Sequence, residues 1–141
     1  MIIYAESSAV LGWLLGEPRG EEVRRALEDA DGVVASRLTR LECLRALARL
    51  EATRQRTPAD TEHLLGLFAR ASAEWTMIEI AAELVERAAA PFPEEPVRAL
   101  DAIHLASALA VRSVTAEVEM AALDTRVRRN AMRLGIAVRP S

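Results

Sequence analysis

The chain is poor in cysteine and aromatic residues and has no lysine. Its single cysteine, Cys43, excludes an internal disulfide framework and the paired-cysteine zinc sites. Aromatic residues make up 4% of the sequence, and we expect both tryptophans, Trp13 and Trp75, to be core residues and not platforms for stacked bases. All 18 basic residues are arginines, which suits bidentate phosphate contacts and is equally explained by codon composition.

Long hydrophobic runs are also missing. No segment approaches the roughly twenty apolar residues that span a bilayer. The apolar N-terminal segment, residues 1–15, is interrupted by Glu6 and has no preceding basic residue, unlike a secretory signal. We therefore expect a cytoplasmic protein without a membrane partner. The net charge of −3 argues against a broadly basic, nucleic-acid-coating surface.

The hydrophobic pattern predicts one α/β domain over residues 1–141. Short β-branched runs are typical of strands and lie at residues 2–4, 33–35, 75–80, 118–123 and 136–138. Segments with helical periodicity separate them, and these connections are too long for hairpins. The sequence therefore predicts a three-layer α/β/α sandwich with a mainly parallel sheet of about four to five strands.

Four acids, Glu6, Glu42, Asp101 and Asp124, occupy places where solubility gives no reason for a carboxylate. They follow predicted strands or lie on apolar stretches of helices. Parallel strands bring such positions to one edge, where open α/β folds bind ligands. Clustered carboxylates oppose folding unless a cation or a proton neutralises them, and carboxylate oxygens suit Mg²⁺ or Mn²⁺. The quartet therefore predicts metal-assisted hydrolysis of a phosphodiester.

Each acid also has a structural interpretation. Asp124 can cap a helix, Asp101 gains from a helix dipole, and Glu42 can pair with Arg45 three positions on. His104 shares a helix face with Asp101, where it orients a water, supports a ligand or serves as a structural histidine. These alternatives remain open at the level of sequence.

Four segments resemble PIN-domain proteins across essentially the whole chain. They are IIYAESSAVLGWLLGE, SRLTRLECLRAL, RALDAIHLASAL and ALDTRVRRNAMRLGI, in the family's order and at its usual intervals. The chain length and the sequences of these motifs look most like those of the VapC-type toxins of toxin-antitoxin pairs. The resemblance implies a metal-dependent endoribonuclease that cuts RNA, dimerises and is silenced by a cognate antitoxin.

Carried over by position, the resemblance makes Glu6, Glu42, Asp101 and Asp124 the catalytic acids that hold Mg²⁺ or Mn²⁺. Ser8 matches the hydroxyl that braces the first acid, with His104 in support. RNA would contact arginines near the four acids. The candidates are Arg37, Arg40, Arg45, Arg126, Arg128 and Arg129. Each of these arginines is also explained as part of a solvated helix face.

Glu6 departs from the family pattern, which usually has aspartate at this position. The extra methylene moves the carboxylate by roughly an ångström, and such a shift can cost on the order of a hundredfold in rate. One alternative is therefore a weakened PIN-fold module that only binds RNA or a protein. Another, a phosphatase-like α/β domain, lacks the repeated aspartates of such sites around Glu6.

Overall fold

The computed structural model describes residues 1–141 and has the predicted three-layer architecture. A five-stranded sheet in the order β3-β2-β1-β4-β5 is parallel throughout. The strands are β1 (Ile2–Ala5), β2 (Gly32–Ser36), β3 (Thr76–Ile78), β4 (Val118–Ala121) and β5 (Ala137–Arg139). The helices are α1 (Ser7–Leu14), α2 (Gly20–Asp29), α3 (Arg37–Ala52), α4 (Pro58–Ser72), α5 (Ala82–Ala89), α6 (Ala99–Val114) and α7 (Thr125–Arg133).

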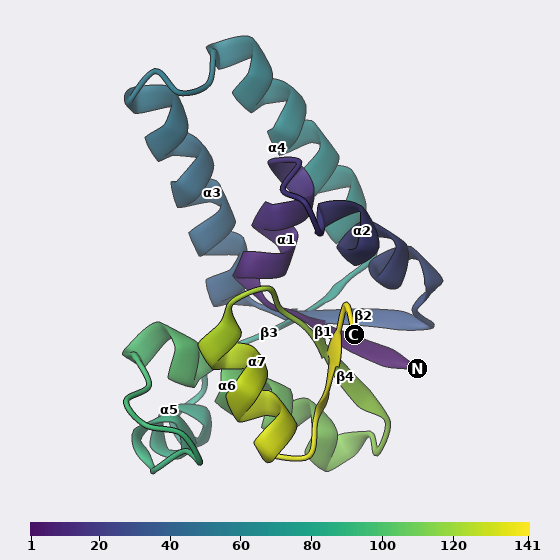
Figure 1. The fold of residues 1–141 in the computed structure, drawn as a ribbon, viewed down its shortest axis with the longest axis vertical. Helices are drawn as coiled ribbons and strands as arrows, with labels where there is room; N and C mark the ends of the chain where they lie inside the picture. Colours follow the sequence, from purple (N-terminus) through teal and green to yellow (C-terminus); the bar gives the residue numbers. More distant parts are fainter.

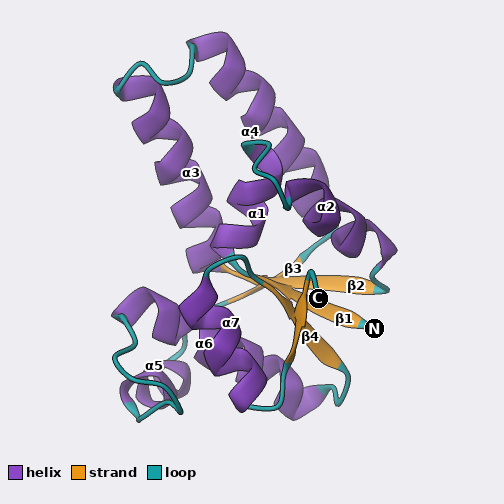
Figure 2. Cartoon of the chain, viewed as in Figure 1, coloured by secondary structure: helices purple, strands orange, loops and turns teal.

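The helices cover both faces of the sheet. Helices α1 to α4 lie on one side, with α3 and α4 forming a long antiparallel pair, and α5 to α7 lie on the other (Figure 1). Figure 2 shows the strands as a single layer between these two groups. No helix is both long enough and apolar enough to cross a bilayer.

The central strand β1 sets the register of the site. Ala5, its last residue, pairs with Ala35 of β2 and Ala121 of β4. The carboxyl ends of these three strands therefore lie side by side. Residues immediately after them are brought to one edge of the sheet.

Alternation along β1 divides the core between the two faces. Tyr4 belongs to the cluster under α6 and α7, whereas Ala5 belongs to the cluster under α1, α3 and α4. Because both faces of a parallel sheet are covered, its strands are apolar almost without interruption. The cluster under α1, α3 and α4 consists of Ala5, Val10, Leu14, Val33, Ala35, Cys43, Leu47, Leu64 and Phe68.

Several local predictions differ from the structure only at their ends. The strand predicted over residues 75–80 is limited to Thr76–Ile78, and that over 118–123 ends at Ala121. Trp75 precedes β3 and packs against the core. Helix α4 begins with a capping box, in which Thr57 and Asp60 satisfy each other's backbone N–H groups.

Glycine allows α1 and α2 to cross closely. A Cβ atom at Gly20 would overlap the backbone carbonyl group of Gly12, which cannot move aside as a flexible side chain would. Gly12 in turn faces the side chain of Leu123 in the loop after β4. These small residues let α1 lie directly against the two segments that flank it.

Two leucines on α3 test the assignment of its buried face. Leu47 is 1% exposed and Leu41 is 55% exposed. We expect Leu47→Ala to lower the free energy of unfolding by about 2–5 kcal/mol, because it leaves a cavity in the core. Leu41→Ala is the matched control and should change it by less than about 0.5 kcal/mol. Equal effects in urea denaturation would contradict this orientation of α3.

Candidate active site

The four acids come from four different elements at the carboxyl edge of the sheet. Glu6 directly follows β1 and caps α1, and Asp124 follows β4 and caps α7. Glu42 lies in the second turn of α3, and Asp101 lies in the first turn of α6. Because α3 and α6 cover opposite faces, the edge is the place where the two helical layers meet.

Ser8 joins the ends of β1 and β4. Its hydroxyl group donates to Glu6 Oε2 and accepts the backbone N–H groups of Leu123 at 2.9 Å and Asp124 at 3.0 Å. One donor and two acceptor positions are all that a hydroxyl offers. Ser8 is therefore fully used in fixing the loop that carries Asp124 against the start of α1.

Glu6 is buried, with 4% of its surface exposed. Its Oε2 also accepts the backbone N–H of Ser8 at 3.0 Å, whereas Oε1 lies 3.9 Å from His104 Nε2 and makes no hydrogen bond. Burial raises the pKa of Glu6, and the negative charge of Glu42 acts in the same direction. His104 and Ser8 oppose this rise without cancelling it.

A fully buried histidine fixes Glu42. His104 Nε2 lies 2.5 Å from Glu42 Oε1, and its Nδ1 lies 2.8 Å from the Tyr4 hydroxyl. Since an ionised carboxylate only accepts, Nε2 is the donor. Ser7 donates to the same Oε1 at 2.7 Å. Burial acts to raise the pKa of Glu42, but the hydrogen bonds from His104 and Ser7 outweigh it and lower the pKa.

The pair with Arg45, which was the structural alternative for Glu42, does not form. Glu42 turns inward to His104 and Ser7, and Arg45 takes part in none of the ion pairs. Sequence reasoning missed Ser7 and Tyr4 as members of this network. Ser7 gave a weak signal, because a second hydroxyl beside Ser8 exceeds what one helix cap requires.

Asp101 and Asp124, like Glu42, are partly exposed. Burial raises the pKa of Asp101, followed by the negative charge of Asp124, and Arg98 at 3.7 Å partly offsets this rise. Asp124 Oδ1 accepts the backbone N–H groups of Arg126 at 3.0 Å and Val127 at 3.1 Å. The capping role considered for Asp124 is thus present, and it engages only Oδ1.

Three of the acids share one arrangement. Glu6, Glu42 and Asp124 each anchor one carboxylate oxygen on internal donors and leave the other without a hydrogen bond. Repulsion links the quartet, since Glu42 acts on both Glu6 and Asp101, and Asp124 acts on Asp101. In these side-chain positions no three His, Cys, Asp or Glu residues form a group that could hold a metal ion.

Three of the six candidate arginines are held by partners within the chain, and three are not. Arg37 pairs with Glu79, Arg129 pairs with Glu94, and Arg128 donates to the backbone carbonyls of Ala122 and Pro140. The other three are exposed and take part in none of the ion pairs; they are Arg40, Arg45 and Arg126.

Two solved structures share the fold. VapC20 of Mycobacterium tuberculosis, described as a Sarcin-Ricin loop cleaving toxin, superposes with a TM-score of 0.63 at 19% identity, covering 96% of each chain. A chain of VapBC2 from Rickettsia felis, solved bound to a DNA fragment from the promoter, gives 0.65 at 11% identity, covering 98% of this chain and 97% of that one. No curated protein sequence matches this chain.

A family model extends the likeness from fold to sequence. The model for the PIN domain matches residues 3–132, which include all four acids together with Ser8 and His104. One family pattern therefore describes over nine-tenths of the sequence. The chain belongs to the PIN domain family.

Proposed function

We propose that this chain is an endoribonuclease that depends on Mg²⁺ or Mn²⁺ and acts as the toxin of a VapBC-type toxin-antitoxin pair. The observation that carries the proposal is the one-oxygen anchoring of Glu6, Glu42 and Asp124 beside the partly exposed Asp101. Internal donors that orient a carboxylate while leaving an oxygen free are typical of the surroundings of metal ligands.

The donor set fits a hard divalent cation. Asp101, Asp124, Glu42 and Glu6 supply only carboxylate oxygens, which Mg²⁺ and Mn²⁺ prefer. A bound cation would lower the pKa of a water and neutralise charge on the leaving oxygen of a phosphodiester. His104 and Ser7 hold Glu42 in place, and Ser8 holds Glu6 and the Asp124 loop.

The substrate and the antitoxin would meet the same edge. Arg40 and Arg45 lie on α3 with Glu42, and Arg126 lies two residues after Asp124, so a phosphate backbone can contact arginines on both sides of the acids. RNA affinity should then fall as salt rises. An antitoxin segment that neutralises the acids would exclude RNA. A cytoplasmic location follows from this function.

A homodimer is also part of the proposal. Six large apolar side chains are exposed; they are Leu41, Ile80, Val85, Leu100, Val114 and Met132. A cavity of about 600 Å³ lies between β3, α5 and α6, and Val114 at its edge is 86% exposed. The surface around this cavity is the candidate dimer interface.

The first test is RNA cleavage by Asp101→Asn with and without EDTA. We expect the substitution to reduce kcat/KM by about a hundredfold or more, because it removes a charged ligand oxygen. EDTA should abolish the cleavage by the unsubstituted protein. Asp29→Asn, the same change at an exposed residue of α2, should have no effect. Cleavage that survives both EDTA and Asp101→Asn would exclude the mechanism.

Metal binding has a readout that is independent of RNA. A ligand at 100 times its Kd stabilises the folded state by about 2.7 kcal/mol. MgCl₂ should therefore raise the melting temperature of the unsubstituted protein by several degrees. Asp101→Asn should lose this rise, and Asp29→Asn should keep it. An equal rise in all three proteins would indicate a general salt effect.

Glu6→Asp separates a weakened nuclease from a binding module. Aspartate also caps helices well, and its shorter side chain draws the carboxylate back toward β1. We expect kcat to rise by up to about a hundredfold, the size of penalty that a misplacement of about an ångström can cause. Absence of cleavage in both forms would favour the non-catalytic alternative, which neither the fold nor the family match favours.

A further inference from the structure

A second cavity lies at the opposite end of the sheet from the acids. It has a volume of about 450 Å³ and is formed by α1, α2, α4 and the beginning of β2. That volume is within the range of about 300–1,000 Å³ typical of small-molecule sites. None of the four acids lines it, so it is separate from the proposed nuclease site.

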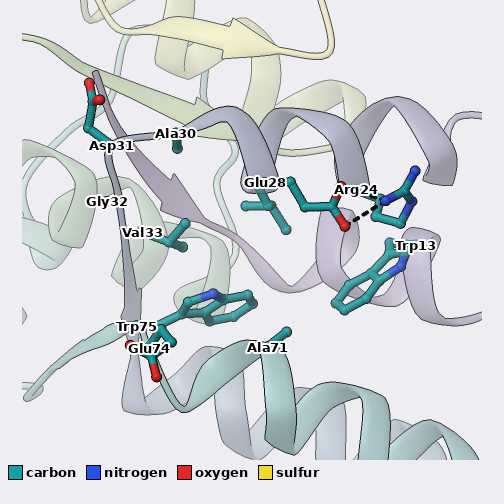
Figure 3. A pocket seen from close by; sticks show the side chains of 11 residues that line it. Trp13, Arg24, Glu28, Ala30, Asp31, Gly32, Val33, Ala71, Glu74 and Trp75 are labelled. Carbon is teal, nitrogen blue, oxygen red and sulfur yellow. Dashed lines mark hydrogen bonds and ion pairs between the residues drawn. The ribbon is translucent and has the colours of Figure 1, made fainter.

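Both tryptophans of the chain line this cavity. Figure 3 shows Trp13 and Trp75 on either side of the space, with Ala71 between them and Glu28 and Arg24 across from it. Phe68 contacts Trp75 edge-on, with ring centroids 6.0 Å apart and an interplanar angle of 81°, and so supports that indole from the core. The expectation that both tryptophans are core residues is incomplete, because each packs on the core and also borders the cavity.

The charges at the rim favour a cation. Three of the four charged side chains that line the cavity are acidic, namely Glu28, Asp31 and Glu74, and the fourth is Arg24. Arg24 binds Glu28 at 2.5 Å and Glu21 at 2.6 Å, and Arg25 also pairs with Glu21, so the ion pairs of α2 leave the acidic excess of the lining in place. Asp31 is paired with the N-terminal ammonium group, and Glu74 takes part in none of the ion pairs. Negative charge around aromatic faces attracts cations both by ordinary electrostatics and through the ring quadrupoles.

We propose that the Trp13–Trp75 cavity binds an organic cation, an alkylguanidinium or alkylammonium group with an apolar stem. The stem would lie against Leu27, Val33 and Ala71, and the cationic head would lie between the indoles and Glu28. Indole is the ring that attracts cations best. An anion or a neutral hydrocarbon would use only part of this lining.

Tryptophan fluorescence tests the proposal directly, because the chain has 2 tryptophans and both line the cavity. The probe is n-butylguanidinium, and n-butylurea is its uncharged analogue of similar shape. We expect n-butylguanidinium to change the emission saturably at millimolar concentration and n-butylurea to bind at least about tenfold more weakly. Equal responses to the two compounds would overturn the proposal.

Two matched variants on α2 locate the binding. Glu28→Gln removes a rim carboxylate and should weaken n-butylguanidinium binding several-fold. Glu22→Gln, an equally exposed acid that also pairs with an arginine but does not line the cavity, should leave it unchanged. Circular dichroism melts should show that both variants fold. Identical affinities in Glu28→Gln and Glu22→Gln would place the cation elsewhere and refute the assignment.

A third arm distinguishes the source of the cation. A short alanine peptide with one central arginine is titrated beside n-butylguanidinium. Tighter binding of the peptide assigns the cavity to an arginine side chain of a protein partner, and tighter binding of n-butylguanidinium assigns it to a free small molecule. Either result supports the cation site, whereas failure of both probes to bind rejects it. RNA cleavage enters none of these measurements.

Discussion

The hydroxyl group of Ser8 is the contact on which the acidic edge depends. Parallel register brings the ends of β1 and β4 together, but register alone does not fix the loop that follows β4. Ser8 does so by holding two successive backbone N–H groups of that loop while it donates to Glu6. The first and last of the four acids, 118 positions apart in sequence by their numbers 6 and 124, thereby share one side chain as their support.

Like charges at this edge are tolerated because the protein treats the acids differently. Glu42 receives hydrogen bonds that lower its pKa, whereas burial raises the pKa of Glu6 and of Asp101. The cluster therefore contains acids that differ in how readily they carry charge, an arrangement often found at functional sites. The burial of His104 is tolerated because both of its ring nitrogens have hydrogen-bond partners.

Sequence predicted most of the fold because strand and helix patterns are local. The strand ends also predicted where Glu6 and Asp124 would lie, since parallel sheets align their carboxyl ends. The hydrogen-bond partner of Glu42 was not predictable from the sequence. Arg45 lies only three positions away, but Glu42 binds His104, which is 62 positions away. Likewise, aromatic composition indicated that Trp13 and Trp75 would be buried, but not that α1, α2 and α4 would leave a cavity between them.

Helix α1 connects the acidic edge to the Trp13–Trp75 cavity. Trp13 lies seven residues after the Glu6 cap, which corresponds to about 10 Å along the helix at about 1.5 Å per residue. Ser7, Ala9 and Gly12 are buried in it, and larger side chains would push the helix away from the sheet and from the loop after β4. By allowing this close packing, the same small residues position Glu6 at the start of α1 and set the distance between Trp13 and Trp75. Changes in the packing of α1 should therefore affect both sites together.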